Sequence, residues 1–242
     1  MSSTDAEPLE IRPATVDDAE AIADVLVRTR AAAVPAMPAL VHDEASVLAH
    51  LRGRLAEAEA WVALVDGAAV GFALADAAWL DMLYVLPEHA GAGIGSALLD
   101  LVKHARPEGF ALWVFESNHA AREFYRRRGL VELERTDGSG NEERQPDVRM
   151  AWPGHEPMTY LRAQIDEVDA ELAAVISRRV ALTTEIQQHK PVAGHAGRDE
   201  SRETEIAERM AQQAPVLTAQ EWRRILHEVI TVSLDAAERH TP

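Results

Sequence analysis

The chain has 242 residues, 47% of them hydrophobic, and a formal net charge of −16 at pH 7. This length and composition are typical of a globular protein with one large or two small domains. The acidic balance argues against nucleic acid as the main partner, because binding phosphate backbones usually requires a basic face. The absence of cysteine excludes disulfides, thiolate metal sites and cysteine nucleophiles.

The sequence shows no targeting or metal-binding signal. Residues Met1 to Leu9 are polar and acidic, without the basic start and apolar core of a signal peptide, and no apolar run approaches the length of a membrane span. The ten histidines show neither an HExxH motif nor paired ligand spacing. We therefore expect a cytoplasmic protein with no metal and no membrane partner.

The order of the segments predicts two domains. From Glu10 to Trp152 short apolar runs alternate with helical stretches, whereas from Met158 onward the pattern is helical with one Pro/Gly-rich break. Residues 153–157, Pro-Gly-His-Glu-Pro, are typical of a short and fairly stiff linker. The predicted domains are therefore residues 1–152 and 158–242.

The first part of the N-terminal domain is predicted to contain a helix and a β-hairpin. The helix covers Asp17 to Arg30, with its apolar residues facing inward. Two strands follow at Trp61–Val65 and Ala69–Leu74, and the Asp66-Gly67 pair between them is a strong signal for a hairpin turn.

The next segment carries candidate chemistry. We expect a strand at Leu80–Val85, a turn at Pro87–Ala92, and a helix that begins at Gly93-Ile94-Gly95-Ser96 and runs to about His104. Such a helix N-terminus presents unpaired backbone N–H groups and the positive end of the helix dipole. The arrangement suits a pyrophosphate, although the same glycine spacing also occurs in tight turns with close helix packing.

The rest of this domain adds two strands and a short helix. A strand from Ala111 to Glu116 leads into a helix that contains Tyr125, and a further strand starts at Arg128-Gly129-Leu130 and ends near Trp152. The motifs of the domain are Ile11-Arg12-Pro13-Ala14, Val85-x-Pro87, Gly91-x-Gly93-Ile94-Gly95, Asn118-x-x-Ala121 and Phe124-Tyr125-x-x-x-Gly129-Leu130. Together they resemble the GNAT family of acetyl-CoA-dependent N-acetyltransferases over residues 10 to 152.

The resemblance implies an α+β fold, with a mixed central sheet flanked by helices, and a reaction between acetyl-CoA and an unknown amine. The backbone of Leu83, Tyr84 and Val85 would pair with the pantetheine arm of acetyl-CoA. The pyrophosphate would be held by the backbone N–H groups of Gly91, Ala92, Gly93, Ile94, Gly95 and Ser96. Asn118 would contact the cofactor, and Tyr125 would protonate the departing CoA thiolate.

Two features of this site depart from the family pattern or stay open. The family usually has Arg or Gln at the position of Ala90 and often a basic residue at that of Ala92, so side-chain contacts to the phosphates are missing. Asp81 and Glu116, near strand ends, are the candidates for the base that deprotonates the amine. Without cysteine, transfer would be direct within a ternary complex.

A cation interrupts a long apolar stripe in the second domain. From Thr159 onward apolar residues recur at alternating spacings of four and three, as in a helix buried along one stripe. The stripe consists of Leu161, Ile165, Val168, Leu172, Val175, Arg179, Leu182 and Ile186. A buried unpaired guanidinium is costly, so Arg179 must pair with a carboxylate, reach solvent or bind an anionic ligand. Further cations at Arg162, Lys190 and Arg202 favour a polyanionic ligand.

Two more helices complete the predicted domain. Residues Pro191–Gly197 form a loop, Asp199 can cap a helix that ends near Gln213, and Thr218 can cap a third helix through Ala237. The third helix is expected to bury Trp222, Ile225, Leu226, Val229, Ile230 and Leu234. Three helices, one of them much longer than the others, enclose little core in a monomer, so we expect a homodimer through the long helices.

The charged residues of this domain have a specific spacing. They are found in Leu161-Arg162-x-x-Ile165-Asp166-x-x-Asp169, Arg178-Arg179, Lys190 and Arg198-Asp199-x-x-Arg202-Glu203. This set resembles the all-helical, AroQ-type chorismate mutases over residues 158–240. The resemblance implies that chorismate, a dicarboxylate, rearranges to prephenate without a nucleophile or a metal. The protein need only hold the compact conformer and stabilise the charge that develops at the ether oxygen.

The same resemblance implies the roles of the charged residues. Arg162, supplied by the partner subunit of a dimer, and Arg179 would clamp the carboxylates. Lys190 would bind a carboxylate and the ether oxygen, and Ser233 would contact a carboxylate. The substrate hydroxyl would be positioned by Asp199 and Glu203, with Arg202 ordering the pocket.

One position departs from this second pattern and leaves three hypotheses open. Ala237 stands where the family usually has Gln or Glu, so the second donor to the ether oxygen is missing. The first hypothesis is a bifunctional enzyme, chorismate mutase and acetyltransferase, in the shikimate pathway of aromatic amino-acid biosynthesis. In the second, the helical domain is a noncatalytic dimerisation or chorismate-sensing module. In the third, it is an isochorismate pyruvate lyase.

Overall fold

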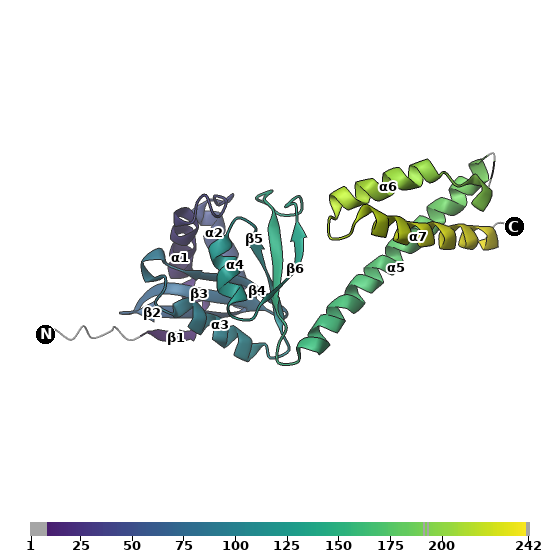
Figure 1. The fold of residues 1–242 in the computed structure, drawn as a ribbon. Coiled ribbons are helices and arrows are strands. Elements are labelled where there is room, and N and C mark those ends of the chain that lie inside the picture. Colours follow the sequence, from purple (N-terminus) through teal and green to yellow (C-terminus); the bar gives the residue numbers. More distant parts are fainter. Residues whose placement is uncertain (1–8, 191, 193, 241–242) are drawn as a thin grey trace. The chain divides into compact units, whose positions relative to one another are not determined.

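The computed structural model describes residues 9–190, 192 and 194–240 (Figure 1). The prediction that Met1 to Leu9 are not a signal peptide concerns residues that, except for Leu9, lie outside the described part of the chain. Pro191 of the predicted loop also lies outside it. The structure divides into two compact units, residues 1–161 and 162–242. None of the described helices combines the length and the apolarity that crossing a membrane requires.

The first unit is a seven-stranded sheet with helices. Its elements in chain order are β1 (Glu10–Pro13), a 3-10 turn (Val16–Asp18), α1 (Ala19–Ala32), α2 (Glu44–Glu57), β2 (Glu59–Val65), β3 (Ala68–Asp76), β4 (Trp79–Val85), a 3-10 turn (Pro87–His89), α3 (Ile94–Ala105), β5 (Phe110–Phe115), α4 (His119–Arg126), β6 (Val131–Thr136) and β7 (Asp147–Trp152). The predicted mixed sheet flanked by helices is confirmed.

Two elements differ from the sequence prediction. Helix α2 was not predicted; Asp43 caps it, and only three of its side chains, Val47, Leu51 and Leu55, are buried. The single strand expected from Arg128 to Trp152 is instead the antiparallel pair β6 and β7, joined by residues 137–146. Polar, glycine-rich residues in that connection favour a loop over an extended strand.

The strand order is β1-β2-β3-β4-β5-β7-β6, and β4 and β5 are the one parallel pair among the described strands. Strand β3 is buried from Val70 to Ala75 on both of its faces, because α1 packs on β3 and β4 and α3 packs on β2, β3 and β4 (Figure 1). In the described chain, β4 and β5 pair only through Trp79 and Ala111. The facing edges of these two strands are therefore unpaired beyond that point, and the sheet opens there.

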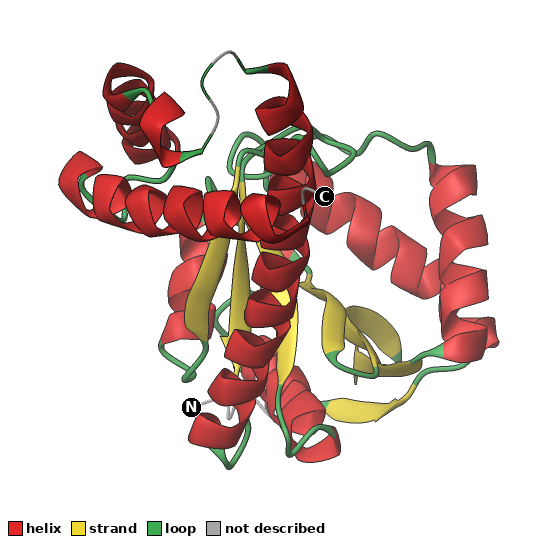
Figure 2. Ribbon diagram, turned by 90° about the vertical axis from the view of Figure 1, so that its right-hand side faces the viewer, coloured by secondary structure: helices red, strands yellow, loops and turns green. Residues whose placement is uncertain are grey.

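The second unit is helical, as predicted. It contains α5 (Pro157–His189, which begins in the first unit), a 3-10 turn (His195–Gly197), α6 (Glu200–Gln213) and α7 (Ala219–His240), and its described residues form no strand (Figure 2). Both predicted caps are confirmed. The Asp199 carboxylate accepts a hydrogen bond from the N–H of Arg202 at 3.0 Å. The Thr218 hydroxyl accepts from the N–H of Glu221 at 3.3 Å, and the Glu221 carboxylate accepts from the N–H of Thr218 at 2.8 Å.

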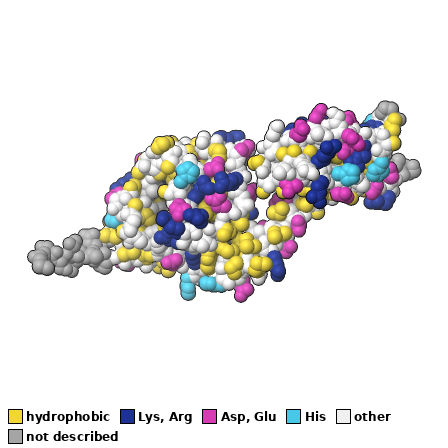
Figure 3. Space-filling view, viewed as in Figure 1, with side chains coloured by type: hydrophobic (Ala, Val, Ile, Leu, Met, Phe, Trp, Pro, Cys, Tyr) yellow, Lys and Arg dark blue, Asp and Glu magenta, His cyan; other side chains and the backbone are white. Residues whose placement is uncertain are grey.

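The apolar stripe of α5 is not buried within one chain. Its residues Ile165, Val168, Leu172, Val175, Leu182 and Ile186 are between 50% and 61% exposed, and hydrophobic side chains lie on the surface along α5 (Figure 3). On α7 the prediction is partly right. Leu226 and Leu234 are buried and Trp222, Val229 and Ile230 are half-buried, but Ile225 is exposed. One chain therefore leaves a long apolar surface uncovered.

The segment after β7 packs on the first unit. Pro153 and Gly154 are buried, and the N–H of His155 donates to the carbonyl oxygen of Pro107 at 3.0 Å. Gly154 has φ +70°, and a Cβ there would lie 2.5 and 2.6 Å from backbone atoms of Glu108. Both the conformation and the space therefore require glycine.

We predict that Gly154→Ala destabilises the first unit by about 1–3 kcal/mol, because it adds left-handed strain and a backbone clash. Thermal unfolding followed by circular dichroism should show the transition shifted down by several degrees. Gly140→Ala is the matched control, since a Cβ there meets nothing within 4 Å. Equal transition temperatures for the two variants would contradict the prediction.

Candidate functional site

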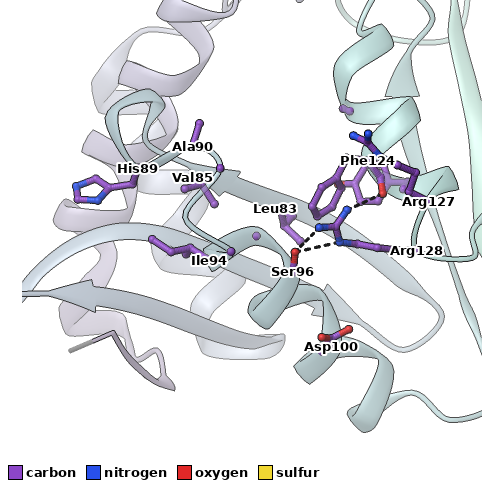
Figure 4. A pocket seen from close by; sticks show the side chains of 15 residues that line it. Leu83, Val85, His89, Ala90, Ile94, Ser96, Asp100, Phe124, Arg127 and Arg128 are labelled. Atoms are coloured by element: carbon purple, nitrogen blue, oxygen red, sulfur yellow. Dashed lines mark hydrogen bonds between the residues drawn. The ribbon is translucent and has the colours of Figure 1, made fainter. Parts of the chain in front are cut away.

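The first candidate site is a cavity of about 900 Å³ beside the open edge of β4 (Figure 4). It is lined by the β4 residues Leu83 and Val85, by the loop and first turn of α3 from His89 to Ser96 except Ala92, and by Phe124, Tyr125, Arg127 and Arg128 from α4 and the turn after it. Asp100 and Ala121 complete the lining. The cavity thus brings together residues from four of the predicted motifs.

Most of the predicted cofactor-binding residues lie on this cavity. Leu83, Val85, Gly91, Gly93, Ile94, Gly95 and Ser96 line it, whereas Tyr84, Ala92 and Asn118 do not. The Tyr84 ring stacks on Phe72, with the ring centres 5.7 Å apart. The Asn118 side chain accepts from the N–H of Ala121 at 3.1 Å and so caps α4.

The glycines allow the chain to enter α3 with exposed amides. Gly91 and Gly93 have φ +82° and +87°, a region that favours glycine. The first helical hydrogen bond runs from the N–H of Ala97 to the oxygen of Gly93 at 3.0 Å. The preceding N–H groups of the first turn therefore have no acceptor inside the helix and, with the helix dipole, attract an anion.

A cation that sequence reasoning missed faces these amides. The guanidinium of Arg128 lies 3.8 Å from the centre of the Phe124 ring, and it donates to the Ser96 hydroxyl and, at 3.1 Å, to the carbonyl oxygen of Phe124 (Figure 4). Within the described residues no ion pair includes Arg128. The charge of Arg128 therefore remains available to a bound anion. The side chains of Ala90 and Ala92 offer no positive charge in this region.

Tyr125 is buried at the inner end of the same cavity. Its side chain is 8% exposed and packs edge-on against Phe124 with the ring centres 5.1 Å apart. Burial, with a smaller contribution from the charge of Tyr84, raises the pKa of Tyr125 well above its ordinary value. The hydroxyl is therefore protonated throughout the neutral range.

The structure holds both predicted base candidates in ion pairs away from this cavity. Asp81 is bound by Arg54, which also reaches Asp76 at 3.3 Å. Glu116 accepts from Arg135 at 2.6 Å. Neither carboxylate lines the cavity.

A second cavity of about 610 Å³ lies where β5 meets the β6–β7 connection, and it contains carboxylates that the sequence did not single out. Glu143 pairs with the buried Arg30 at 2.9 Å, and Arg30 in turn lies 5.5 Å from the centre of the Phe115 ring. Asp147 accepts from Asn141 at 2.9 Å and from Thr136. This cavity offers two carboxylates beside aromatic side chains, an environment that suits a cationic group.

In the helical unit, Arg179 and Ser233 come together as predicted. Arg179 donates to the Ser233 hydroxyl at 2.6 Å and to the carbonyl oxygen of Val229 at 3.3 Å. Ser233 is fully buried. Burial lowers the pKa of Arg179, and the charge of Glu203 opposes that shift. The guanidinium is thus held by neutral oxygens with one carboxylate nearby.

Glu203 is held by an arginine that was not assigned a role. Arg198 donates to both carboxylate oxygens of Glu203, at 2.9 and 2.7 Å, and also to Thr231 at 3.0 Å. This hydrogen bonding lowers the pKa of Glu203 despite its partial burial. The pair joins the start of α6 to α7.

The other predicted site residues of the helical unit form contacts that do not include Arg179 or Ser233. The Lys190 amine donates to the carbonyl oxygen of Gly197 at 2.7 Å, and Asp199 acts as the helix cap with Arg202. Arg162 is exposed on α5, and seventeen residues of helix separate it from Arg179 by about 25 Å. One chain therefore does not bring Arg162 to Arg179.

Two features at the end of α7 bear on the remaining predictions. Ala237 is 1% exposed, so the position of the missing donor is closed by packing. His195, Asp235 and Glu238 have ligand atoms within 4.8 Å of one another, but all three side chains are exposed. His195 and Asp235 already form a hydrogen bond at 2.8 Å, so this cluster is a surface hydrogen-bonded pair with a neighbouring carboxylate.

Comparison with known protein families matches each half of the chain. Residues 27–130 match the Acetyltransferase (GNAT) family, and residues 161–238 match Chorismate mutase type II. A GCN5-related N-acetyltransferase from Rhodopseudomonas palustris has the same fold, with a TM-score of 0.51 and 24% identity over 62% of this chain and 99% of that one. YjaB from Escherichia coli gives a TM-score of 0.50, 24% identity and coverage of 61% and 99%.

Curated relatives match the first unit. An uncharacterized N-acetyltransferase of Archaeoglobus fulgidus is 36% identical over 96 residues, which are 34% of this chain and 65% of the relative. Peptidyl-lysine N-acetyltransferase YiaC of Escherichia coli is 33% identical over 101 residues, which are 41% of this chain and 66% of the relative. The chain thus spans slightly less than two thirds of the length of these relatives.

We predict that Arg198→Met destabilises the helical unit by about 1–2 kcal/mol at neutral pH, because it leaves a part-buried carboxylate without its partner. Since the folded-state pKa of Glu203 is lowered, the stabilising contribution is complete above the ordinary glutamate pKa and is lost as pH falls through the lowered value. The difference in melting temperature between variant and wild type should therefore shrink on acidification. Arg209→Met, an exposed position on α6, is the control, and a pH-independent difference would contradict the assignment.

Proposed function

Because the chain carries an acetyltransferase domain of the GNAT family followed by a chorismate mutase type II domain, we propose that it is a bifunctional enzyme. Its N-terminal domain, residues 1–152, transfers an acetyl group from acetyl-CoA to an amine. Its C-terminal domain, residues 158–242, rearranges chorismate to prephenate. The observation that carries the proposal is that each domain holds an arginine whose hydrogen bonds go to neutral oxygens, Arg128 on Ser96 and Arg179 on Ser233, so that its charge can attract an anion.

The residues of the first cavity fit acetyl-CoA, which supplies a thioester-bound acetyl group. The N–H groups at the start of α3 and the Arg128 guanidinium bind the phosphates, and the side of the cavity formed by Leu83 and Val85 takes the pantetheine arm. Arg128 thereby replaces the side-chain donors that positions 90 and 92 lack. The protonated hydroxyl of Tyr125 gives its proton to the departing sulfur.

The amine acceptor is proposed to approach from the second cavity. Glu143 and Asp147 give this cavity a negative lining beside Trp113 and Phe115, and such a lining attracts an ammonium group. YiaC is a peptidyl-lysine N-acetyltransferase by name, which supports the ε-amine of a lysine in a peptide segment as the acceptor class.

The helical domain is proposed to act as a homodimer. The exposed stripe of α5 would be covered by the same stripe of a second copy, which buries apolar side chains that one chain leaves in water. The partner's Arg162 would then join Arg179, Ser233 and Lys190 around the dicarboxylate. Lys190 donates to the ether oxygen, where negative charge develops.

The closed position at Ala237 favours a second candidate function for this domain. Ala237 is buried and its side chain has no hydrogen-bond donor for the ether oxygen, and loss of one such donor typically costs about a hundredfold or more in rate. The alternative is a noncatalytic module that binds chorismate and dimerises. An isochorismate pyruvate lyase is distinguished from both by its products.

We predict that Arg128→Met weakens CoA binding about tenfold to a hundredfold, because one charge-assisted contact to phosphate is lost. Isothermal titration calorimetry with CoA measures the effect, and dephospho-CoA shows whether the lost contact belongs to the 3′-phosphate or to the pyrophosphate. Arg126→Met is the matched control, because Arg126 is exposed and paired with Glu123 outside the cavity. Equal losses in the two variants would refute the role of Arg128.

We predict that Arg179→Ala and Arg162→Ala each abolish chorismate turnover, followed by its ultraviolet absorbance and by product identification. If the site is shared between subunits, mixing and re-equilibrating the two inactive variants restores activity, because mixed dimers contain one intact site. Prephenate as product establishes the mutase, and pyruvate establishes the lyase. Binding of chorismate to the wild type without turnover would instead support the sensing module.

A further inference from the structure

Lysine is rare in this chain. The sequence contains two lysines, Lys103 and Lys190, compared with 22 arginines. An enzyme that acetylates lysine therefore carries only two ε-amines of its own. One of them is the residue proposed to donate to the ether oxygen of chorismate.

The first lysine is occupied within the fold. The amine of Lys103 on α3 donates to the carbonyl oxygen of Arg128 at 2.5 Å and lies 5.5 Å from the centre of the Trp152 ring. Burial lowers the pKa of Lys103. This amine supports the turn that positions Arg128 and is only partly accessible.

The second lysine is presented to solvent. Lys190 is exposed and follows the last residue of α5, and among the described residues its amine makes one hydrogen bond, to the carbonyl oxygen of Gly197. A lysine just outside a helix can enter an acetyltransferase cleft in an extended conformation, which a lysine inside a helix cannot do without unwinding. Lys190 is thus the accessible ε-amine of the described chain.

The charges around Lys190 match those of the second cavity. From Ile186 to Arg198 the sequence contains no Asp or Glu but includes His189, Lys190, His195 and Arg198. The cavity beside β5 is lined by Glu143 and Asp147. Arg198 is already paired with Glu203, and Glu143 with Arg30. Among the described residues the charges without an ion pair are the Lys190 amine on one side and the Asp147 carboxylate on the other, so the amine fits the part of the cavity that Asp147 lines.

We propose that the acetyltransferase domain acetylates the Nζ atom of Lys190, in its own or another copy of the chain, and thereby switches off the chorismate site. This proposal rests on the proposed function of both domains. A bond forms between Nζ and the carbonyl carbon as the carbon–sulfur bond breaks. The ammonium group of Lys190 loses two protons overall, of which one ends on the departing CoA sulfur and one in solvent.

Acetylation changes the chemistry at this position decisively. The amide that replaces the ammonium group has no charge and a single N–H donor, so it loses both the attraction to a carboxylate and the strong donor to the ether oxygen. The chorismate domain should then lose about a hundredfold or more in turnover, as expected for removal of one such donor. Conversely, bound chorismate occupies the amine and should protect Lys190 from acetylation.

The test incubates the purified full-length protein with acetyl-CoA and locates the acetyl group by peptide mass spectrometry. Chorismate turnover, or chorismate affinity by calorimetry, is measured on the same samples. Lys190→Arg keeps the charge but should block incorporation, while Arg209→Met, at an exposed position on α6, should leave incorporation and chorismate turnover unchanged. Tyr125→Phe should reduce labelling, and its CoA binding and chorismate turnover report whether both domains are folded. A lysine-containing peptide is the external acceptor.

The expected result is one acetyl group on Lys190, loss of chorismate turnover in proportion to the label, and protection by chorismate. Label on Lys103 or on the N-terminal amine but not on Lys190, or acetyl-Lys190 with unchanged turnover and affinity, overturns the proposal. If the peptide is acetylated and Lys190 is not, self-acetylation fails while the proposed acetyltransferase stands. If neither is acetylated, both fail.

Discussion

An acidic chain that binds anions must keep a few cations out of ion pairs. With a net charge of −16, this protein has ample carboxylates to neutralise its arginines. Arg128 and Arg179 meet the constraint in the same way, because each donates to a serine hydroxyl and to a backbone carbonyl oxygen. Neutral acceptors orient a guanidinium without cancelling its charge, so both sites retain an attraction for phosphate or carboxylate.

The arginines that do form ion pairs have a different part in the architecture. Arg30 ties α1 to the β6–β7 connection through Glu143, and Arg198, held by Glu203 at the start of α6, ties that end of the helix to Thr231 on α7. Both pairs are partly or largely buried, so each element they join is fixed in one position. Paired arginines thus join elements of the fold, whereas Arg128 and Arg179 are the arginines proposed to bind anions.

The Lys190 amine connects the two proposed activities, because it is both an acceptor for acetylation and a residue of the chorismate site in these proposals. In the proposed function, the acetyltransferase domain modifies amines and the chorismate domain depends on one amine, that of Lys190. Apart from Lys103, the other basic residues counted among Lys and Arg are arginines. Arginine has no ε-amine to acetylate. A single acetylation at Lys190 would therefore affect the chorismate domain and leave the anion-binding residues Arg162, Arg179 and Arg128 unmodified.

The sequence by itself determined the local features. The glycine loop before α3, the caps at Asp199 and Thr218, and the helical second half all follow from residues within one or two turns of each other, where spacing and backbone preference decide the structure. Tertiary structure alone decided that Arg128 bonds Ser96, that Glu143 pairs with Arg30, that Arg198 bonds Thr231 on α7, and that the α5 stripe is left exposed. Those contacts join segments far apart in the chain, and no local pattern encodes which distant side chain folding brings near.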